Sequence, residues 1–121
     1  MSKKIVVVDD EPDILTVVVF RLKKLGYQVL SAINGKEALA LIKAEKPDLI
    51  LLDYRLPDMN GIEIARAVRA DSALRNTPII LLSASSGKDL TVEAYKNAAI
   101  NEYIKKPFDP EELLACVKKY L

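Results

Sequence analysis

Three carboxylates follow an apolar run near the start of the chain. The stretch IVVV leads directly into Asp9, Asp10 and Glu11, which are followed by Pro12. Two carboxylates about 4 Å apart repel each other by roughly 4 kcal/mol at an effective dielectric constant near 20. A helix cap needs only one such group. The surplus of negative charge therefore favours a site for a hard cation such as Mg²⁺, which prefers oxygen ligands.

Polar residues also end three further apolar runs. Asp53 follows LILL, Ser83 follows IILL, and Lys105 and Lys106 follow a shorter run. A carboxylate beside a bound cation can act as a nucleophile toward a phosphoryl group and form an acyl phosphate. A lysine and a hydroxyl would then stabilise charge on the phosphoryl oxygens. Asp53 is the best candidate nucleophile, because it stands alone where its run ends.

Each of these residues also has a purely structural interpretation. Asp10 could cap the following helix, and Asp53 could open the turn DYRLPDMNG, because aspartate is favoured in both places. Ser83 could be an ordinary loop hydroxyl, and either lysine could be a solvated surface group. The combination at four strand ends favours the chemical interpretation. Three aspartates, one Mg²⁺ and one inward lysine would bring the formal charge to zero. Glu11 is expected in the first turn of the helix, where the macrodipole favours it.

The elements that must position these residues alternate regularly along the chain. Short β-branched runs alternate with helix-patterned stretches, and Gly, Pro, Asn or Asp marks each change. Strands are predicted over Lys4 to Asp9, Tyr27 to Ala32, Asp48 to Asp53, Pro78 to Leu82 and Glu102 to Lys105. Helices are predicted over Pro12 to Leu25, Lys36 to Glu45, Gly61 to Ala70, Lys88 to Ala98 and Pro110 to Tyr120.

A (βα)5 alternation predicts an α/β fold, in which a doubly wound parallel five-stranded sheet carries helices on both faces. The continuously apolar runs are typical of central strands that are covered on both sides. In such sheets, ligands bind outside the carboxyl ends of the strands, at the point where the strand order reverses. The polar residues at the strand ends would therefore converge on one crevice.

Composition narrows the function classes further. The chain has 121 residues, which suits one domain, and its 18 basic and 17 acidic side chains leave a net charge of +1. This net charge is too small to indicate electrostatic binding to nucleic acid or to an anionic membrane surface. No apolar run approaches the roughly 20 residues of a membrane span, and MSKKI does not resemble a signal peptide. A cytoplasmic location is expected.

The residue types that are missing also restrict the chemistry. There is no histidine, and Cys116 is the single cysteine. An internal disulfide, a histidine-based zinc site and a histidine base are therefore excluded. Cys116 is expected to be a buried structural thiol on the inward side of the last helix.

Four motifs in order, VVVDDEP, LILLDYRLPDMNG, PIILLSAS and YIKKPF, are similar to those of the receiver domain of two-component response regulators. The family is typified by the chemotaxis response regulator, and the resemblance covers residues 1–121 as one domain. It implies a flavodoxin-like fold with strand order 2-1-3-4-5. It also implies a phosphorylation-dependent signalling switch in a phosphorelay, with no enzymatic activity besides self-catalysed phosphoryl transfer and autodephosphorylation.

The resemblance implies roles for individual residues around the phosphorylation site. Asp53 would accept the phosphoryl group from a phosphohistidine of a sensor histidine kinase or a histidine phosphotransfer protein. Asp9 and Asp10 would bind Mg²⁺ together with Asp53 and the backbone carbonyl of Arg55. Lys106, rather than Lys105, matches the family's lysine.

The resemblance also implies a switch and an output surface. Ser83 would be the switch hydroxyl, and Tyr103 the aromatic residue that changes rotamer with it. Arg55 and Ser85 would tune the lifetime of the phosphate. The peptide bond between Lys106 and Pro107 would be cis.

Output would run through helix 4, strand 5 and helix 5, over Lys88 to Tyr120. This surface would control a downstream protein target or an output domain. No contact of this domain with nucleic acid or a membrane is expected, and the protein would be a monomer or a phosphorylation-dependent dimer. Ala99 stands where the family commonly has glycine. If that position needs a positive φ, alanine adds strain on the order of 1 kcal/mol.

Three alternatives compete with this interpretation. A haloacid-dehalogenase type of aspartyl-phosphate phosphatase needs a second aspartate two residues after the nucleophile, where this chain has Arg55. A flavin binder needs a Ser/Thr/Gly-rich loop after the first strand, where this chain has repelling carboxylates. A degenerate receiver would only bind partners, yet all five expected chemical residues are present.

Overall fold

The computed structural model describes residues 2–83 and 99–121. In these residues, five parallel strands form one sheet in the order β2-β1-β3-β4-β5. The strands are β1 (Lys4–Val8), β2 (Gln28–Ala32), β3 (Leu49–Asp53), β4 (Ile79–Ser83) and β5 (Glu102–Lys105). The helices described are α1 (Pro12–Lys24), α2 (Gly35–Glu45), α3 (Gly61–Ala70), α5 (Pro110–Tyr120) and the short 3₁₀ helix η1 (Ser72–Leu74).

The fold class and the strand order are confirmed. Each predicted element that falls in the described residues begins and ends within one residue of its observed bounds. The helix predicted over Lys88 to Ala98 lies outside the described residues. The 3₁₀ helix η1 was not predicted, because three residues are too few to show a helical period.

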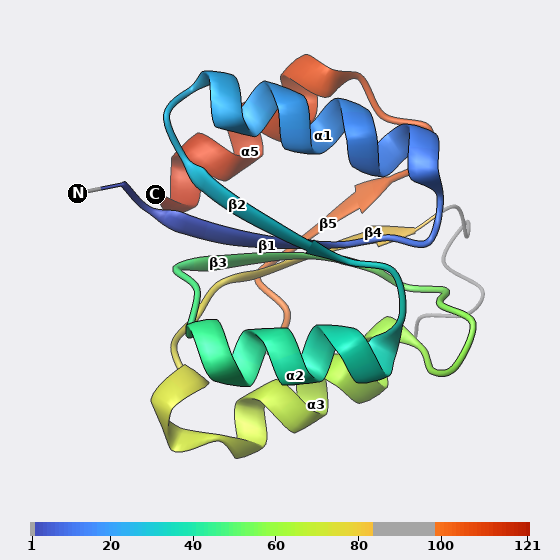
Figure 1. The fold of residues 1–121 in the computed structure, drawn as a ribbon, viewed down its shortest axis with the longest axis vertical. Helices are drawn as coiled ribbons and strands as arrows, with labels where there is room; N and C mark the ends of the chain where they lie inside the picture. The colour runs from blue at the N-terminus through green and yellow to red at the C-terminus, as the bar shows by residue number, and fades with distance from the viewer. Residues whose placement is uncertain (1, 84–98) are drawn as a thin grey trace.

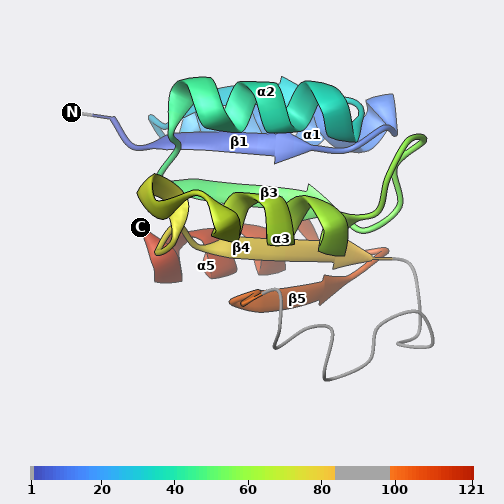
Figure 2. The same cartoon turned by 90° about the horizontal axis from the view of Figure 1, so that it is seen from below.

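The strand order reverses at β1, which pairs with β2 on one side and with β3 on the other. The register places Val8 of β1 opposite Leu52 of β3, and Asp53 opposite Leu82 of β4. Ser83 at the end of β4 lies opposite Lys105 of β5. The carboxyl ends of β1, β3, β4 and β5 therefore reach the same edge of the sheet, where the arrowheads lie in Figure 2.

Helices cover both faces of the sheet (Figure 1). Helices α1 and α5 lie on one face, and α2 and α3 lie on the other. Alternate residues of β1 divide between the two cores: Ile5 and Val7 pack toward α1 and α5, whereas Val6 and Val8 pack toward α2 and α3. Strands β3 and β4 are buried along their whole length, as expected of central parallel strands.

Helix α5 has a defined start and carries the single cysteine. Asp109 caps α5 by accepting a hydrogen bond from the Glu111 amide at 2.9 Å, and Pro110 occupies the first turn. Cys116 is half-buried and packs against the core on the α1/α5 face, with its thiol pKa raised by burial.

Among the helices described, none has the length and apolar character that a membrane crossing requires.

Candidate functional site

Four buried polar side chains lie at the carboxyl edge of the sheet. Asp9 is 0% exposed, Ser83 1%, Asp53 4% and Lys106 7%. Among the described residues, these four are the buried polar or charged side chains. Each is the last residue of a different strand or the residue just beyond it. The structure therefore brings together polar groups from four strands, as the sequence pattern predicts.

The ammonium group of Lys106 contacts three carboxylates. Its Nζ lies 2.8 Å from Asp9 Oδ2, 3.2 Å from Asp53 Oδ2 and 3.2 Å from Glu11 Oε1. Lys105 is exposed, so Lys106 is the lysine that turns inward. The Lys106–Pro107 peptide bond is cis, as the family resemblance implies.

The carboxylates form one acidic cluster. Single carboxylate oxygens of Asp9, Asp10, Glu11 and Asp53 all lie within 4.8 Å of one another. Four carboxylates beside one lysine leave excess negative charge in a partly buried space, and all the donors are hard oxygens. This donor set fits Mg²⁺, which takes carboxylate oxygens while keeping several waters.

Burial perturbs the two charged groups at the centre of the cluster. Burial and the neighbouring Asp9 charge raise the pKa of Asp53 from 3.8 to about 6, although Lys106 and the Arg55 amide oppose this change. Burial alone would lower the pKa of Lys106. Its hydrogen bond to Asp9 and the charges of Asp53 and Asp9 outweigh that effect and raise the pKa. Lys106 therefore stays charged, while Asp53 holds a proton more readily than an ordinary aspartate.

Glu11 corrects an expectation. It is the N-cap residue of α1 rather than a first-turn residue, and its side chain makes no capping hydrogen bond. Instead its carboxylate reaches Lys106, while Asp9 Oδ1 accepts a hydrogen bond from the Glu11 amide at 2.9 Å. Asp10 does not occupy the N-cap position. The helix-cap interpretation of Asp10 is therefore not supported, and Glu11 joins the acidic cluster.

The expected switch residues lie on adjacent strands. Ser83 ends β4, and its carbonyl accepts a hydrogen bond from the Lys106 amide at 2.7 Å. Tyr103 of β5 is half-buried, lies opposite Leu81 and packs against the core on the α2/α3 face. Arg55 is exposed on the loop after β3. Ser85 lies outside the described residues, so its expected role is untested.

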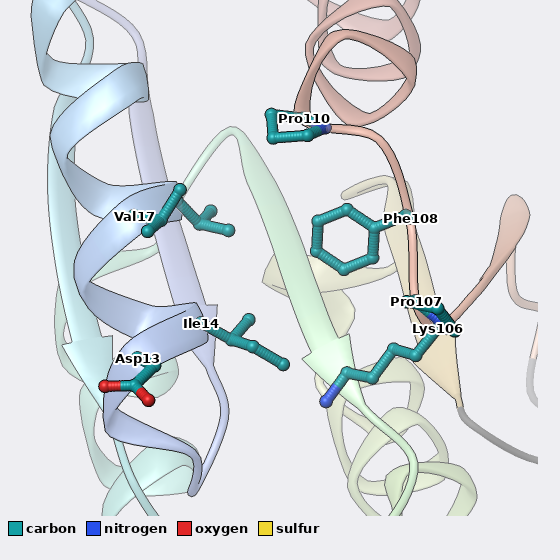
Figure 3. A pocket seen from close by; sticks show the side chains of 8 residues that line it. Asp13, Ile14, Val17, Lys106, Pro107, Phe108 and Pro110 are labelled. Atoms are coloured by element: carbon teal, nitrogen blue, oxygen red, sulfur yellow. The ribbon is translucent and has the colours of Figure 1, made fainter.

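An apolar groove adjoins the acidic cluster (Figure 3). It has a volume of about 280 Å³ and runs between α1 and the segment that joins β5 to α5. Ile14 and Val17 line its α1 side, and Phe108 and Pro110 line the opposite side. Lys106 also lines the groove, so this one side chain joins the apolar surface to the charged site.

Fold and site together define a class of protein. A doubly wound parallel sheet carries an acidic cluster and a buried lysine where its strand order reverses. The family model of the response regulator receiver domain matches residues 5–118. The chain belongs to this family and is a receiver domain of two-component systems.

Relatives of known sequence agree with this assignment. The chain is 41% identical over 121 residues to the phosphate regulon transcriptional regulatory protein PhoB of Pseudomonas aeruginosa, covering 100% of this chain and 52% of that protein. It is also 41% identical to the alkaline phosphatase synthesis transcriptional regulatory protein PhoP of Bacillus subtilis, of which it covers 49%. The chain therefore spans about half the length of these two relatives.

Solved structures show the same fold. The chemotaxis response regulator CheY4 of Vibrio cholerae superposes with a TM-score of 0.92 at 33% identity, with full coverage of both chains. The receiver domain of a sensor histidine kinase from Pseudomonas aeruginosa has a TM-score of 0.87 at 32% identity, covering 99% of this chain and 98% of that one. The latter structure holds a magnesium ion coordinated in its active site cleft.

Proposed function

We propose that this receiver domain is a phosphorylation-dependent switch in which Asp53 accepts a phosphoryl group. The observation that carries the proposal is the contact of Lys106 with Asp53 inside an acidic cluster. Asp53 is a buried carboxylate next to the ammonium group of Lys106 and to other carboxylates that can bind a metal ion. A nucleophile that forms an aspartyl phosphate needs these neighbours. The phosphoryl donor is a phosphohistidine on a sensor histidine kinase or a histidine phosphotransfer protein.

Asp9, Asp10, Asp53 and the backbone carbonyl of Arg55 would hold Mg²⁺ at this site. The bound ion supplies positive charge that stabilises the phosphoryl oxygens during transfer. The clustered carboxylate oxygens support this role, and so does the magnesium ion in the similar receiver domain. Glu11 also contacts Lys106 and contributes negative charge to balance it.

The transfer makes one bond and breaks one bond. An oxygen of Asp53 forms the new P–O bond, while the P–N bond to the donor imidazole breaks and its electron pair stays on that nitrogen. Lys106 neutralises charge on the phosphoryl oxygens, and the Ser83 hydroxyl donates to another of them. Water later hydrolyses the acyl phosphate and restores Asp53, at a rate that Arg55 and Ser85 tune.

Phosphorylation would bias an equilibrium between two conformations. The phosphoryl group adds negative charge that Lys106 and Ser83 engage better in the active conformation, and Tyr103 follows Ser83. The change then reaches the surface that includes β5 and α5 and controls a protein target or an output domain.

The wider setting is part of the same proposal. The chain would act in the cytoplasm, where its kinase presents the phosphohistidine. Residues 1–121 would form one receiver domain, as a monomer or as a phosphorylation-dependent dimer.

Incubation with acetyl phosphate and Mg²⁺ tests the chemistry. We expect the intact mass to increase by one phosphoryl group in the wild type and in Asp13→Asn, and to stay unchanged in Asp53→Asn or with EDTA. Asp13 is the matched control, because it is an exposed aspartate of α1 outside the acidic cluster. A phosphoryl group that persists in Asp53→Asn would overturn the proposal. A phosphorylated histidine kinase in place of acetyl phosphate tests the partner.

A further inference from the structure

The loop that follows Asp53 is closed at its base by its own backbone. Residues 54–60 join β3 to α3, and the Gly61 amide donates to the Tyr54 carbonyl at 2.6 Å. Arg55 and Asn60 form an antiparallel bridge across the loop. Asn60 then begins α3 with a capping box shared with Glu63. These bonds close the base of the loop, and residues 56–59 form its tip.

Asp58 ties that tip to helix α2. Its Oδ1 accepts a hydrogen bond from the Gly35 amide at 2.7 Å, and its Oδ2 accepts one from the Lys36 amide at 2.9 Å. The first amides of a helix have no partner within the helix, and the helix dipole favours a negative charge beside them. These two hydrogen bonds also lower the pKa of Asp58, so the carboxylate is ionised at neutral pH.

Packing reinforces this contact. A Cβ atom at position 35 would overlap the Met59 side chain and would come within 3.2 Å of Asp58 Oδ1. The loop tip therefore lies directly against the first residue of α2, where any larger side chain would require Met59 to shift. Helix α2 contributes no side chain to the acidic cluster, so this contact links the site to an element outside it.

We propose that Asp58 is a positioning residue for the cation and phosphoryl site, through its attachment of the 54–60 loop to α2. The inference rests on the proposed function, because that loop carries Arg55, whose backbone carbonyl is an expected ligand. A loop that is already ordered loses little conformational entropy when a ligand binds to it. Without the attachment, ligand binding must order the loop, and the affinity falls.

Mg²⁺ titration of the unphosphorylated protein by calorimetry measures this effect directly. We expect Asp58→Ala to raise the dissociation constant about three- to tenfold, the range of one or two hydrogen bonds. Asp58→Asn should fall between Asp58→Ala and the wild type, because its single amide oxygen can accept only one of the two bonds. All titrations are made at a temperature at which every variant is fully folded.

Asn34→Ala is the matched control. Asn34 Oδ1 accepts a hydrogen bond from the Glu37 amide at 2.8 Å, so it caps the same end of α2 without contacting the loop through that bond. Both substitutions weaken the start of α2, but only Asp58→Ala detaches the loop. We expect Asn34→Ala to change the Mg²⁺ dissociation constant less than twofold. Saturating Mg²⁺ should also restore the rate of phosphorylation of Asp58→Ala by acetyl phosphate.

The outcomes separate this inference from the proposed function. Equal Mg²⁺ affinities in Asp58→Ala and the wild type, or equal losses in Asp58→Ala and Asn34→Ala, would overturn the positioning role. So would a wild type that binds no Mg²⁺. A wild type that binds Mg²⁺ but takes up no phosphoryl group would overturn the proposed function. In that case, a selective loss of affinity in Asp58→Ala would still support the positioning role.

Discussion

Asp53 is held in an unfavourable charged state when no cation is bound. Its carboxylate is buried beside Asp9, and these two factors raise its pKa to about 6 despite the contact with Lys106. An aspartate whose pKa is higher in the folded than in the unfolded protein destabilises the fold when it is ionised. Binding of a divalent cation would relieve this repulsion, so the proposed Mg²⁺ site would gain part of its affinity from the folded chain.

Removing this charge should stabilise the protein in EDTA. The gap between 3.8 and about 6 corresponds to on the order of 3 kcal/mol. We expect Asp53→Asn to raise the free energy of unfolding at pH 7.5 by on the order of 1 to 3 kcal/mol, measured by urea denaturation. The gain should be full above pH 6 and shrink toward zero between pH 6 and pH 4, because there the folded wild type takes up its proton before the unfolded chain does.

Mg²⁺ and a second aspartate serve as controls for this measurement. Mg²⁺ should stabilise the wild type much more than Asp53→Asn, since a ligand that binds only the folded state raises its stability. Asp10→Asn should also be more stable in EDTA, but by less, because Asp10 is exposed whereas Asp53 is buried. An Asp53→Asn protein that unfolds more easily than the wild type in EDTA would refute the repulsion.

The positions of polar residues at the ends of the predicted strands identified some of the site residues and missed others. Asp9, Asp53 and Ser83 could be predicted, because parallel strands bring their carboxyl ends to one edge. The strand ends left Lys105 and Lys106 open, and only the family resemblance selected Lys106. The roles of Glu11 and Asp58 could not. Glu11 contacts a lysine 95 residues away, and Asp58 contacts amides 22 and 23 residues away. Neither contact follows from strand order, since each depends on how a loop turns.

At the scale of elements, the segment entering β5 adopts a strained turn. Ala99 has a φ of 51°, in the left-handed region that favours glycine. Arg69 of α3 holds this turn, because its Nη2 donates to the Ala99 carbonyl at 2.8 Å and to Asn101 Oδ1 at 3.1 Å. Ala99 therefore does adopt a positive φ, and the strain expected of alanine in that conformation is present.

Ala99→Gly should relieve this strain. We expect the free energy of unfolding to rise by about 0.5 to 1 kcal/mol, because the left-handed cost outweighs the greater entropy of glycine in the unfolded chain. Urea denaturation measures the change. Ala115→Gly is the matched control: this exposed alanine lies inside α5, where glycine should cost about 1 kcal/mol. A loss of stability in both variants would show that the turn at Ala99 carries no strain.

The element boundaries were predictable for a physical reason. Strands β3 and β4 are apolar up to their last residue, as expected where both faces are covered, and Asp109 followed by Pro110 marks a helix start in the sequence itself. Glu11 shows the limit of that approach. A residue directly before Pro12 could be the N-cap residue or lie in the first turn of α1. In the structure Glu11 is the N-cap residue, and its carboxylate contacts Lys106.

At the scale of the whole molecule, the sheet places the charged residues at the carboxyl ends of its strands, next to the point where the strand order reverses. Helices α1 and α5 on one face, and α2 and α3 on the other, bury the strands, so the polar ends emerge together at the rim. The groove beside Lys106 adds an apolar surface next to this charged site. This arrangement supports the proposed function, in which a domain without histidine would receive a phosphoryl group from a partner that has one.

Borohydride trapping of the acyl phosphate tests the central claim most directly. Borohydride reduces an aspartyl phosphate to homoserine, so the modified residue can be identified by peptide mass spectrometry after treatment with acetyl phosphate and Mg²⁺. We predict homoserine at position 53 and at no other aspartate, and none in a sample prepared with EDTA. Homoserine at Asp9 or Asp10 instead, or a phosphorylated protein that yields no homoserine, would contradict the assignment of Asp53 as the phosphoacceptor.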